Sequence, residues 1–302
     1  MGASRATQTS ATAWAASGIR PLVADYVALT KPKVQSLLLL TTIATMYVAG
    51  DPSPGLVALT CLGGYLSAGG AGAVNHWYDR DIDRQMARTA TRPVAAGRIA
   101  PGAALAFGIV LAALSFAELA LTVNLLAAFL ALAGFLGYTL MYTMWLKRST
   151  PQNIVIGGAA GAVPPLVGWA AVTGSVDPAA WYLFAIVFYW TPPHFWALSL
   201  LMKDEYARVG VPMMPVVHGE RETRRQIVLY SLLLYAITQL PFCAGGFGVP
   251  YLVGSVALGG VFIAFAIQLY RNPSRPAALR LYLYSLLYLA LLFGAMVVDA
   301  RL

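Results

Sequence analysis

The stretch that decides the fold is residues 56–83, which read LVALTCLGGYLSAGGAGAVNHWYDRDID. Its first part, residues 56–76, is a run of apolar and small residues long enough to cross a bilayer as a helix, which takes roughly 20 residues. Its last part, from Asn75 to Asp83, carries three acids and an arginine. The stretch therefore predicts a membrane-spanning helix that ends at a charged surface.

Apolar runs of this kind recur along the chain, in which 59% of the 302 residues are hydrophobic and 11% are charged. Helices are the expected form, because a helix satisfies its own backbone hydrogen bonds in lipid. We therefore predict an all-α integral membrane protein with a loose N-terminal tail (residues 1–33) and a single transmembrane domain (residues 34–302). The nine predicted spans are 34–49, 56–76, 101–122, 124–143, 153–173, 180–201, 226–246, 250–270 and 277–298.

The formal charge of +8 is distributed in a way that excludes nucleic acid as the partner. With nine spans, every lysine and arginine except Arg301 falls in the N-terminal tail or in the connections after the second, fourth, sixth and eighth spans. Basic residues near span ends favour the cytoplasmic side. The pattern thus predicts a cytoplasmic N-terminus, a C-terminus outside, and any chemistry on the cytoplasmic face, where the longest charged connections lie.

Two acidic clusters fall on this predicted cytoplasmic face. Asn75, Asp79 and Asp83 are spaced four residues apart, which stacks them on one side of a helix. Asp204 and Glu205 close the sixth predicted span. Oxygen ligands of this type suit Mg²⁺, which prefers a few carboxylates plus the phosphate oxygens of a substrate. The two clusters predict a metal site that clamps a diphosphate between them.

These motifs resemble the intramembrane aromatic prenyltransferases of the UbiA superfamily, and the likeness runs over roughly residues 26–298. Two stretches, TPQNIVIGG at 150–158 and WTPPHFWAL at 190–198, resemble the haem branch of that superfamily in particular. That branch usually has Asp-Asp-Tyr in the second acidic cluster, where this chain has Asp204-Glu205-Tyr206. The longer arm of Glu205 makes Asp204 the better candidate ligand.

The resemblance implies a helical bundle around a central cavity and a reaction in which protohaem IX, farnesyl diphosphate and water give haem O and diphosphate. Haem is then a substrate, and Mg²⁺ is the cofactor. Loss of diphosphate leaves an allylic cation, which a vinyl group of the porphyrin attacks and water quenches. Asp79, Asp83 and Asp204 are the implied catalytic residues. The implied metal ligands are Asn75, Asp79, Asp83, Asp204 and Glu205, and the implied substrate-binding residues are Arg88, Arg92, Lys147, Arg148, His194 and Tyr142.

Alternatives remain open for several of these assignments. Tyr142 either faces the cation or packs in the bundle, and His194 either contacts haem or forms a hydrogen bond between helices. The acceptor is alternatively a quinone precursor or a chlorophyll-type ring, and the class is alternatively a cation-coupled transporter. The resemblance further implies the bacterial cytoplasmic (inner) membrane and a hand-over of product to haem A synthase or a terminal oxidase.

Overall fold

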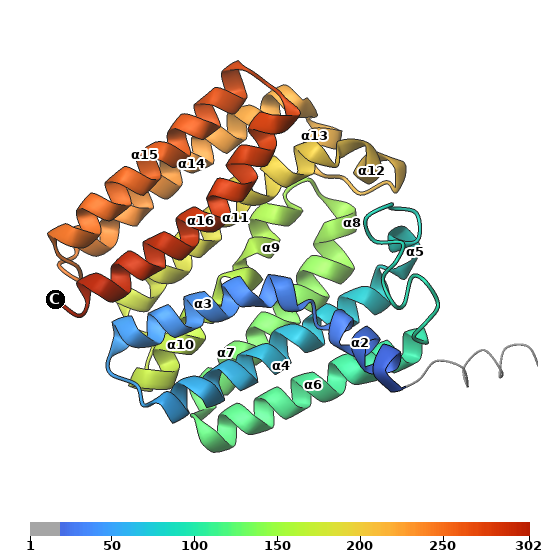
Figure 1. Ribbon diagram of the computed structural model, residues 1–302, viewed down its shortest axis with the longest axis horizontal. Coiled ribbons are helices and arrows are strands. Elements are labelled where there is room, and N and C mark those ends of the chain that lie inside the picture. Colours follow the sequence, from blue (N-terminus) through green and yellow to red (C-terminus); the bar gives the residue numbers. More distant parts are fainter. Residues whose placement is uncertain (1–18) are drawn as a thin grey trace, which may run out of the picture.

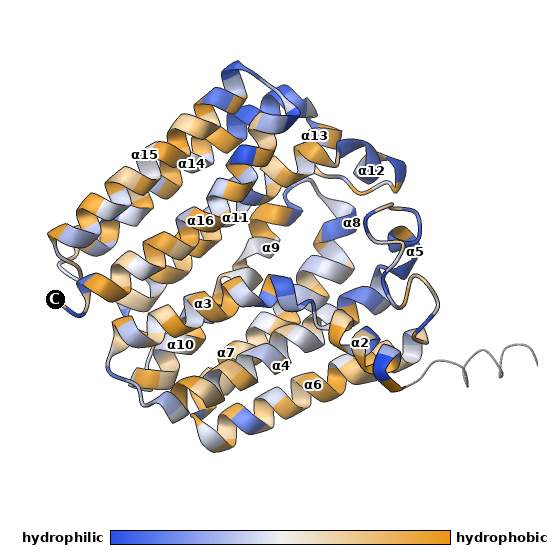
Figure 2. Ribbon diagram, viewed as in Figure 1, coloured by the Kyte–Doolittle hydropathy of each residue, from blue (hydrophilic) through white to orange (hydrophobic). Residues whose placement is uncertain are grey.

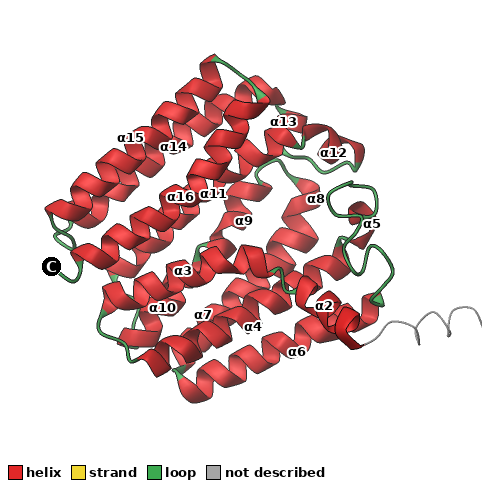
Figure 3. Cartoon of the chain, viewed as in Figure 1, coloured by secondary structure: helices red, strands yellow, loops and turns green. Residues whose placement is uncertain are grey.

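The computed structural model describes residues 19–302, and every regular element in this range is a helix (Figure 3). The first half of the chain contains α2 (Ile19–Leu29), α3 (Pro32–Ala49), α4 (Pro54–Tyr78), α5 (Arg80–Asp83), α6 (Pro101–Thr122), α7 (Leu125–Leu136), η1 (Gly137–Leu146) and α8 (Lys147–Ser149). The second half contains α9 (Asn153–Gly161), α10 (Val163–Thr173), α11 (Pro178–Leu201), α12 (Lys203–Arg208), α13 (Met214–Val217), α14 (Gly219–Cys243), α15 (Val249–Arg271) and α16 (Arg275–Asp299). The long helices lie side by side, and α5, α8, α12 and α13 gather at one end of the bundle (Figure 1).

Seven helical segments of the described residues are long and apolar enough to cross a membrane. They are Pro54–Tyr78, Pro101–Thr122, Leu125–Ser149, Asn153–Thr173, Gly219–Cys243, Val249–Arg271 and Arg275–Asp299. The two other predicted spans coincide with α3 and α11. Lys33 and Gln35 make α3 less apolar, and α11 contains Trp, Tyr and Pro residues together with His194. For α3 and α11, membrane crossing stays a prediction.

The prediction of a loose tail is wrong for residues 19–29, which form α2. Tertiary contacts hold this helix. The ring of Tyr26 packs edge-on against Phe107 of α6 with centroids 4.9 Å apart, and Asp25 pairs with Arg98 at 2.9 Å. Neither partner is near in sequence, so the local pattern did not reveal the helix. The rest of the predicted tail, up to residue 18, lies outside the described residues.

The charged connections after the second and sixth predicted spans are partly helical. The segment 79–100 begins with α5, and the segment 202–225 contains α12, α13 and the first turns of α14. Helix α14 begins at Gly219, ahead of the predicted start at 226, with Glu220 and Glu222 in its first turn. Acidic side chains there are stabilised by the positive end of the helix dipole. Hydrophilic residues concentrate at this end of the bundle, while the long helices are mainly hydrophobic (Figure 2).

Small residues let α4 and α6 approach closely. A Cβ atom added at Gly70 would lie 2.6 Å from the backbone oxygen of Gly108, and one added at Gly108 would lie 2.8 Å from the oxygen of Gly70. Such contacts are typical of helix pairs in membranes, where small residues allow close backbone packing. This packing holds α4 in place. The last turn of α4 carries Asn75 and leads into the acidic row.

Candidate active site

The predicted acidic row forms at the end of α4. The backbone N–H of Asp79 bonds to the oxygen of Asn75 at 2.9 Å, and that of Asp83 bonds to the oxygen of Asp79 at 2.8 Å. The helical path therefore continues from α4 into α5, which stacks the three side chains as the spacing predicted. All three are buried, Asp79 completely. Asn75 Nδ2 donates to Asp79 Oδ2 at 2.7 Å and to Thr143 Oγ1 at 3.2 Å, which ties the row to η1.

Basic side chains surround the buried carboxylates. Lys147 Nζ forms an ion pair with Asp79 Oδ2, and Arg148 approaches Asp79 Oδ1 at 3.3 Å. One guanidinium nitrogen of Arg92 reaches both oxygens of Asp83, at 2.8 and 2.9 Å. The structure thus brings together the acids and three of the four cations that the sequence singled out. Within this cluster, buried carboxylates are paired, as burial of charge requires.

Arg148 also anchors α8 to α5. Its two terminal nitrogens donate to the two oxygens of Asp81 at 2.7 Å each, and its guanidinium lies 4.6 Å from the centre of the Tyr78 ring. The hydrogen bond from Arg148 lowers the pKa of Asp81 from 3.8 to about 2. The Asp81 side chain is 55% exposed, so this pair contributes little stability and mainly orients the arginine.

Lys31 is a site residue that the sequence reasoning did not single out. Its Nζ donates to Asn75 Oδ1 at 2.6 Å and lies 5.9 Å from the ring centre of Tyr138. Burial, with the positive charges of Arg92 and Lys147, lowers the pKa of Lys31 to about 7. Lys31 has φ = 53°, the only positive φ of a non-glycine residue within residues 19–302. Such strained conformations cluster at functional sites, and the Thr-Lys-Pro-Lys sequence that leads into α3 was the available signal.

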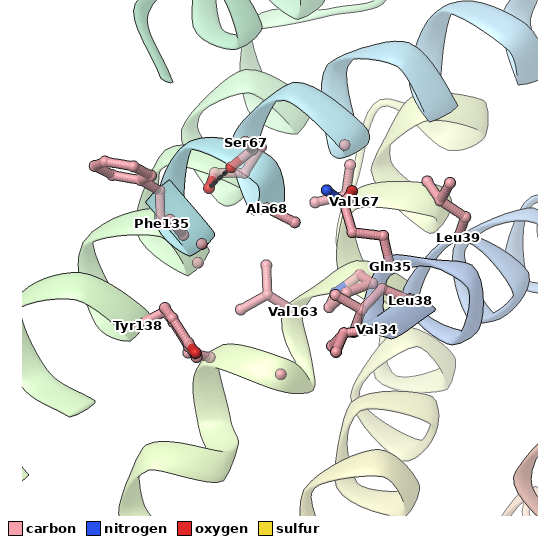
Figure 4. Close-up of a pocket in the computed structure, with 18 of the residues that line it drawn as sticks. Val34, Gln35, Leu38, Leu39, Ser67, Ala68, Phe135, Tyr138, Val163 and Val167 are labelled. Carbon is pink, nitrogen blue, oxygen red and sulfur yellow. Dashed lines mark hydrogen bonds between the residues drawn. The ribbon is translucent and has the colours of Figure 1, made fainter. Parts of the chain in front are cut away.

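An apolar pocket of about 200 Å³ opens beside Lys31 (Figure 4). Most of its wall is aliphatic or aromatic, including Val34, Leu38, Phe135 and Val163. Its polar lining includes Thr30, Lys31, Gln35, Ser67 and Tyr138. Since Lys31 both lines the pocket and bonds to Asn75, the pocket adjoins the acidic row. A charged head and an apolar tail of one ligand could therefore be bound by adjacent parts of the structure.

The second acidic cluster lies on α12. Asp204 is exposed, whereas Glu205 is partly buried and its Oε2 atom is buried without a hydrogen-bond partner. The sequence reasoning favoured Asp204, but Glu205 has the unsatisfied oxygen. Apolar contacts join α12 to the acidic segment, because Tyr206 packs in one cluster with Ile82 and Met86. Burial raises the pKa of Tyr206, and the positive charges of Arg88 and Arg92 oppose this effect.

The oxygen donors of the acidic row and of α12 are of the type that Mg²⁺ prefers. Within residues 19–302, no group of three or more His, Cys, Asp or Glu side chains is arranged to hold a metal ion. Mg²⁺ commonly uses one or two protein carboxylates and takes further oxygens from substrate phosphates. Asp79, Asp83 and the Asn75 amide oxygen supply such hard donors, and Glu205 Oε2 is a buried oxygen in need of a partner. The residues therefore fit Mg²⁺ bound together with a phosphate-bearing ligand.

Tyr142 lies on η1, a π-helical segment that follows α7. Its ring centre is 5.4 Å from that of Tyr138, and a Cβ added at Gly157 would lie 2.5 Å from its ring. The glycine thus makes room for the tyrosine between η1 and α9. Arg88 is exposed on the segment after α5, where its charge acts on Tyr206.

His194 belongs to a separate group between α11 and α16. Its ring stacks between Trp190 and Tyr282, with centroids 4.3 and 4.9 Å away. Nδ1 lies 2.6 Å from Ser285 Oγ, which donates its hydrogen to the Tyr282 carbonyl at 2.6 Å. Because a hydroxyl has one hydrogen, Ser285 accepts from Nδ1–H, and the lone pair of the imidazole is on Nε2. Nε2 has no hydrogen bond within residues 19–302.

The fold and the row of acids define a class of protein. The profile of the UbiA prenyltransferase family matches residues 38–292. The chain therefore belongs to the UbiA prenyltransferase family, and it is a multi-pass membrane protein.

Two curated relatives match most of the chain. A protein of Symbiobacterium thermophilum named protoheme IX farnesyltransferase is 57% identical over 282 residues, which cover 92% of this chain and 94% of that protein. A protein of Roseiflexus sp. (strain RS-1) with the same name is 57% identical over 280 residues, which cover 92% of this chain and 52% of that protein. The chain thus spans about half the length of the Roseiflexus relative.

Solved structures share the fold. A digeranylgeranylglyceryl phosphate synthase superimposes with a TM-score of 0.76 at 19% identity, over 93% of this chain and 99% of the other. A UbiA homologue from Aeropyrum pernix K1 gives 0.72 at 19% identity, over 90% and 98%. A UbiA homologue from Archaeoglobus fulgidus bound to DMAPP and Mg²⁺ gives 0.63 at 17% identity, over 90% and 99%.

Proposed function

We propose that this chain is a haem O synthase that transfers the farnesyl group of farnesyl diphosphate to a vinyl group of protohaem IX. The observation that carries the proposal is the position of Lys31, which joins an apolar pocket to a buried acidic row surrounded by cations. A prenyl diphosphate has the matching form, an apolar chain with a charged head. The name shared by the Symbiobacterium and Roseiflexus relatives supports protohaem as the acceptor.

The basic side chains bind the diphosphate by leaving their partners in the acidic row and donating to the diphosphate oxygens. Lys147 and Arg92 are paired with Asp79 and Asp83, and Lys31 is bonded to Asn75. Diphosphate oxygens accept from these donors in place of the carboxylates. The cations then face the bridging oxygen, where charge develops as the bond to the farnesyl carbon breaks, and fixed donors at such a position are strongly stabilising.

The carboxylates released in this exchange are available to a metal ion. Asn75, Asp79, Asp83 and Glu205 would hold Mg²⁺, with exposed Asp204 as a further candidate, and the ion supplies Lewis-acid stabilisation of the leaving diphosphate. This role agrees with the DMAPP and Mg²⁺ named for the Archaeoglobus homologue.

The aromatic side chains beside the apolar pocket stabilise the positive charge that forms on the reacting carbon. The bond between farnesyl C1 and the diphosphate oxygen breaks, and the terminal carbon of the vinyl group forms a bond to C1. Water adds to the vinyl carbon next to the porphyrin ring and loses a proton, which gives a hydroxyethylfarnesyl side chain and diphosphate. Tyr138 and Tyr142 present ring faces that stabilise the passing positive charge.

His194 is the proposed contact to the acceptor. Its stacked ring and its Nδ1 bond to Ser285 hold the imidazole with Nε2 as the free lone pair. Metal-binding histidines commonly have their other ring nitrogen fixed by such a hydrogen bond. We propose that Nε2 contacts the haem iron and that this contact positions the porphyrin without taking part in bond formation.

We also propose how the chain is oriented in the membrane. Nine spans, with α3 and α11 among them, surround a central cavity in the bacterial inner membrane, with the N-terminus and the site on the cytoplasmic side. The connections rich in arginine and lysine support this orientation. Hand-over of haem O to haem A synthase or a terminal oxidase is the proposed next step.

The test is turnover in membranes that contain the protein, supplied with ferrous protohaem, farnesyl diphosphate and Mg²⁺ and followed by mass analysis of the extracted haems. We expect a hydroxyethylfarnesyl haem that disappears with a chelator or with Asp79→Asn. Asp51→Asn is the matched control, because Asp51 is exposed and pairs with Arg301 far from the site. Prenylation of added quinone precursors without any haem adduct would refute the haem assignment and retain the transferase class.

A further inference from the structure

A second cavity, of about 170 Å³, lies at the end of the bundle where α15 connects to α16. Leu201 of α11, Arg224 of α14, Ser274 and Arg275 contribute to its wall. It shares no lining residue with the apolar pocket beside Lys31. The charge pattern predicts that this end faces the cytoplasm, and hydrophilic residues gather on it (Figure 2).

The two arginines of this cavity have more N–H groups than the surrounding protein has acceptors for. The Arg224 side chain is 14% exposed, and its Nε atom is buried without a hydrogen-bond partner. Its ion pair with Glu220 is long, at 3.4 Å, and Arg275 reaches the carbonyl of Leu201 only at 3.4 Å. A guanidinium group offers five N–H donors, and its strong bonds to anions measure about 2.7–2.9 Å. The cavity therefore has unused capacity to bind an anion.

The start of α16 adds to the positive potential. This helix has 25 residues, and Ser274 caps it by accepting from the backbone N–H of Ala277 at 3.3 Å. Pro276 has no N–H, and among the described residues the backbone N–H of Arg275, at the first position of the helix, has no hydrogen-bond acceptor. The N-terminal end of a long helix is electropositive, which favours an anion beside the two guanidinium groups.

Apart from the carboxylate of Glu220, the remaining wall of the cavity is apolar. Leu200, Leu269 and Ala278 line it, and the exposed side chains Tyr270 and Leu279 follow Leu269 and Ala278 in the sequence. The cavity thus combines an anion-binding end with apolar surface at the edge of the bundle. A free inorganic anion would use only the first of these features, whereas an amphiphile would use both.

We propose that this cavity binds the phosphate group of an anionic phospholipid from the cytoplasmic leaflet, with Arg224 and Arg275 as its donors. The acyl chains then lie along Tyr270 and Leu279. Basic pockets between membrane-spanning helices on the cytoplasmic side suit anionic headgroups, and the planar guanidinium matches two phosphate oxygens at once. Glu220 is the opposing charge, and its 3.1 Å bond to Lys203 draws it toward α12.

The test is the affinity of delipidated protein in detergent for short-chain phosphatidylglycerol, measured by native mass spectrometry. The double variant Arg224→Gln/Arg275→Gln should bind about tenfold more weakly or worse, because two charge-assisted contacts are lost. Its matched control is Arg225→Gln/Arg271→Gln, which removes two neighbouring charges outside the cavity and should bind as the parent protein does. Glu220→Gln should bind more tightly, since the competing carboxylate charge is gone.

Three results would overturn the proposal. The first is equal binding by the double variant and its control. The second is equal binding of phosphatidylcholine of the same chain length, which would show that net negative charge is not recognised. The third is displacement of the lipid by millimolar inorganic phosphate, which would identify a free-phosphate site. If the double variant does not fold, Glu220→Gln still tests the proposal. Unchanged or weaker lipid binding by this variant would contradict an anion site in the cavity.

Discussion

The ion pair between Asp83 and Arg92 allows the structural and catalytic roles of the acidic row to be separated. Asp83 is 2% exposed, and one nitrogen of Arg92 contacts both of its oxygens. Removing one partner of a buried pair typically costs about 3–5 kcal/mol, and the 22% exposure of the Arg92 side chain reduces this to about 2–3 kcal/mol. We therefore expect Asp83→Asn to lower the melting temperature by roughly 5–10 °C.

The double variant Asp83→Asn/Arg92→Gln removes the unpaired charge that remains in each single variant. We expect it to recover about 1–2 kcal/mol of the stability lost, because the two sites are in contact and their effects are not additive. Turnover should stay at least about a hundredfold below that of the parent protein, since both groups are proposed to act on the diphosphate or its metal ion.

The measurements are melting curves in lipid nanodiscs and the rate of formation of farnesylated haem. Asp25→Asn is the control, because Asp25 forms a more exposed pair with Arg98 between α2 and the loop before α6 and should leave turnover intact. Recovery of both stability and turnover in the double variant would refute the reasoning and make the pair purely structural. An unchanged melting temperature for Asp83→Asn would show that the buried pair does not form.

Other expectations concern packing, the pocket and the acceptor. Gly168→Ala should lower the melting temperature by several degrees, because the new Cβ would lie 2.5 Å from a backbone oxygen of α3, whereas Gly294→Ala, with open space around it, should not. Ala68→Leu fills part of the apolar pocket and should raise KM for farnesyl diphosphate more than for geranyl diphosphate in paired turnover assays. Ser285→Ala removes the partner of His194 Nδ1 and should raise KM for haem about tenfold while leaving KM for the prenyl donor unchanged.

Features that depend on one continuous segment were predictable from the sequence. The apolar runs predicted the long helices, and a spacing of four residues placed Asn75, Asp79 and Asp83 on one side, because both patterns follow from helix geometry alone. The assignment of Lys147 and Arg148 to the same site came from the resemblance to the UbiA superfamily, and the structure brings both beside Asp79.

Features that depend on packing between distant segments were not predictable. Lys31 reaches Asn75 only because the chain makes a left-handed turn before α3. The apolar pocket combines small and aliphatic residues from separate helices, none of which differs in sequence from ordinary packing residues. Likewise, the exposure of Asp204 and the burial of a Glu205 oxygen follow from how α12 lies against the acidic segment, which the order of the two residues does not reveal.

The pairing of the buried acids with the protein's own cations has a consequence for biogenesis. Asp79 lies at the end of α4, whereas Lys147 lies beyond η1, so the acid leaves the ribosome well before its partner does. A lone ionised carboxylate is costly once it is buried inside the protein. The end of α4 should therefore stay open to water until the Lys147 segment arrives. Completion of the charge pair would then set the time at which the helices close around the buried acids, before any substrate is present.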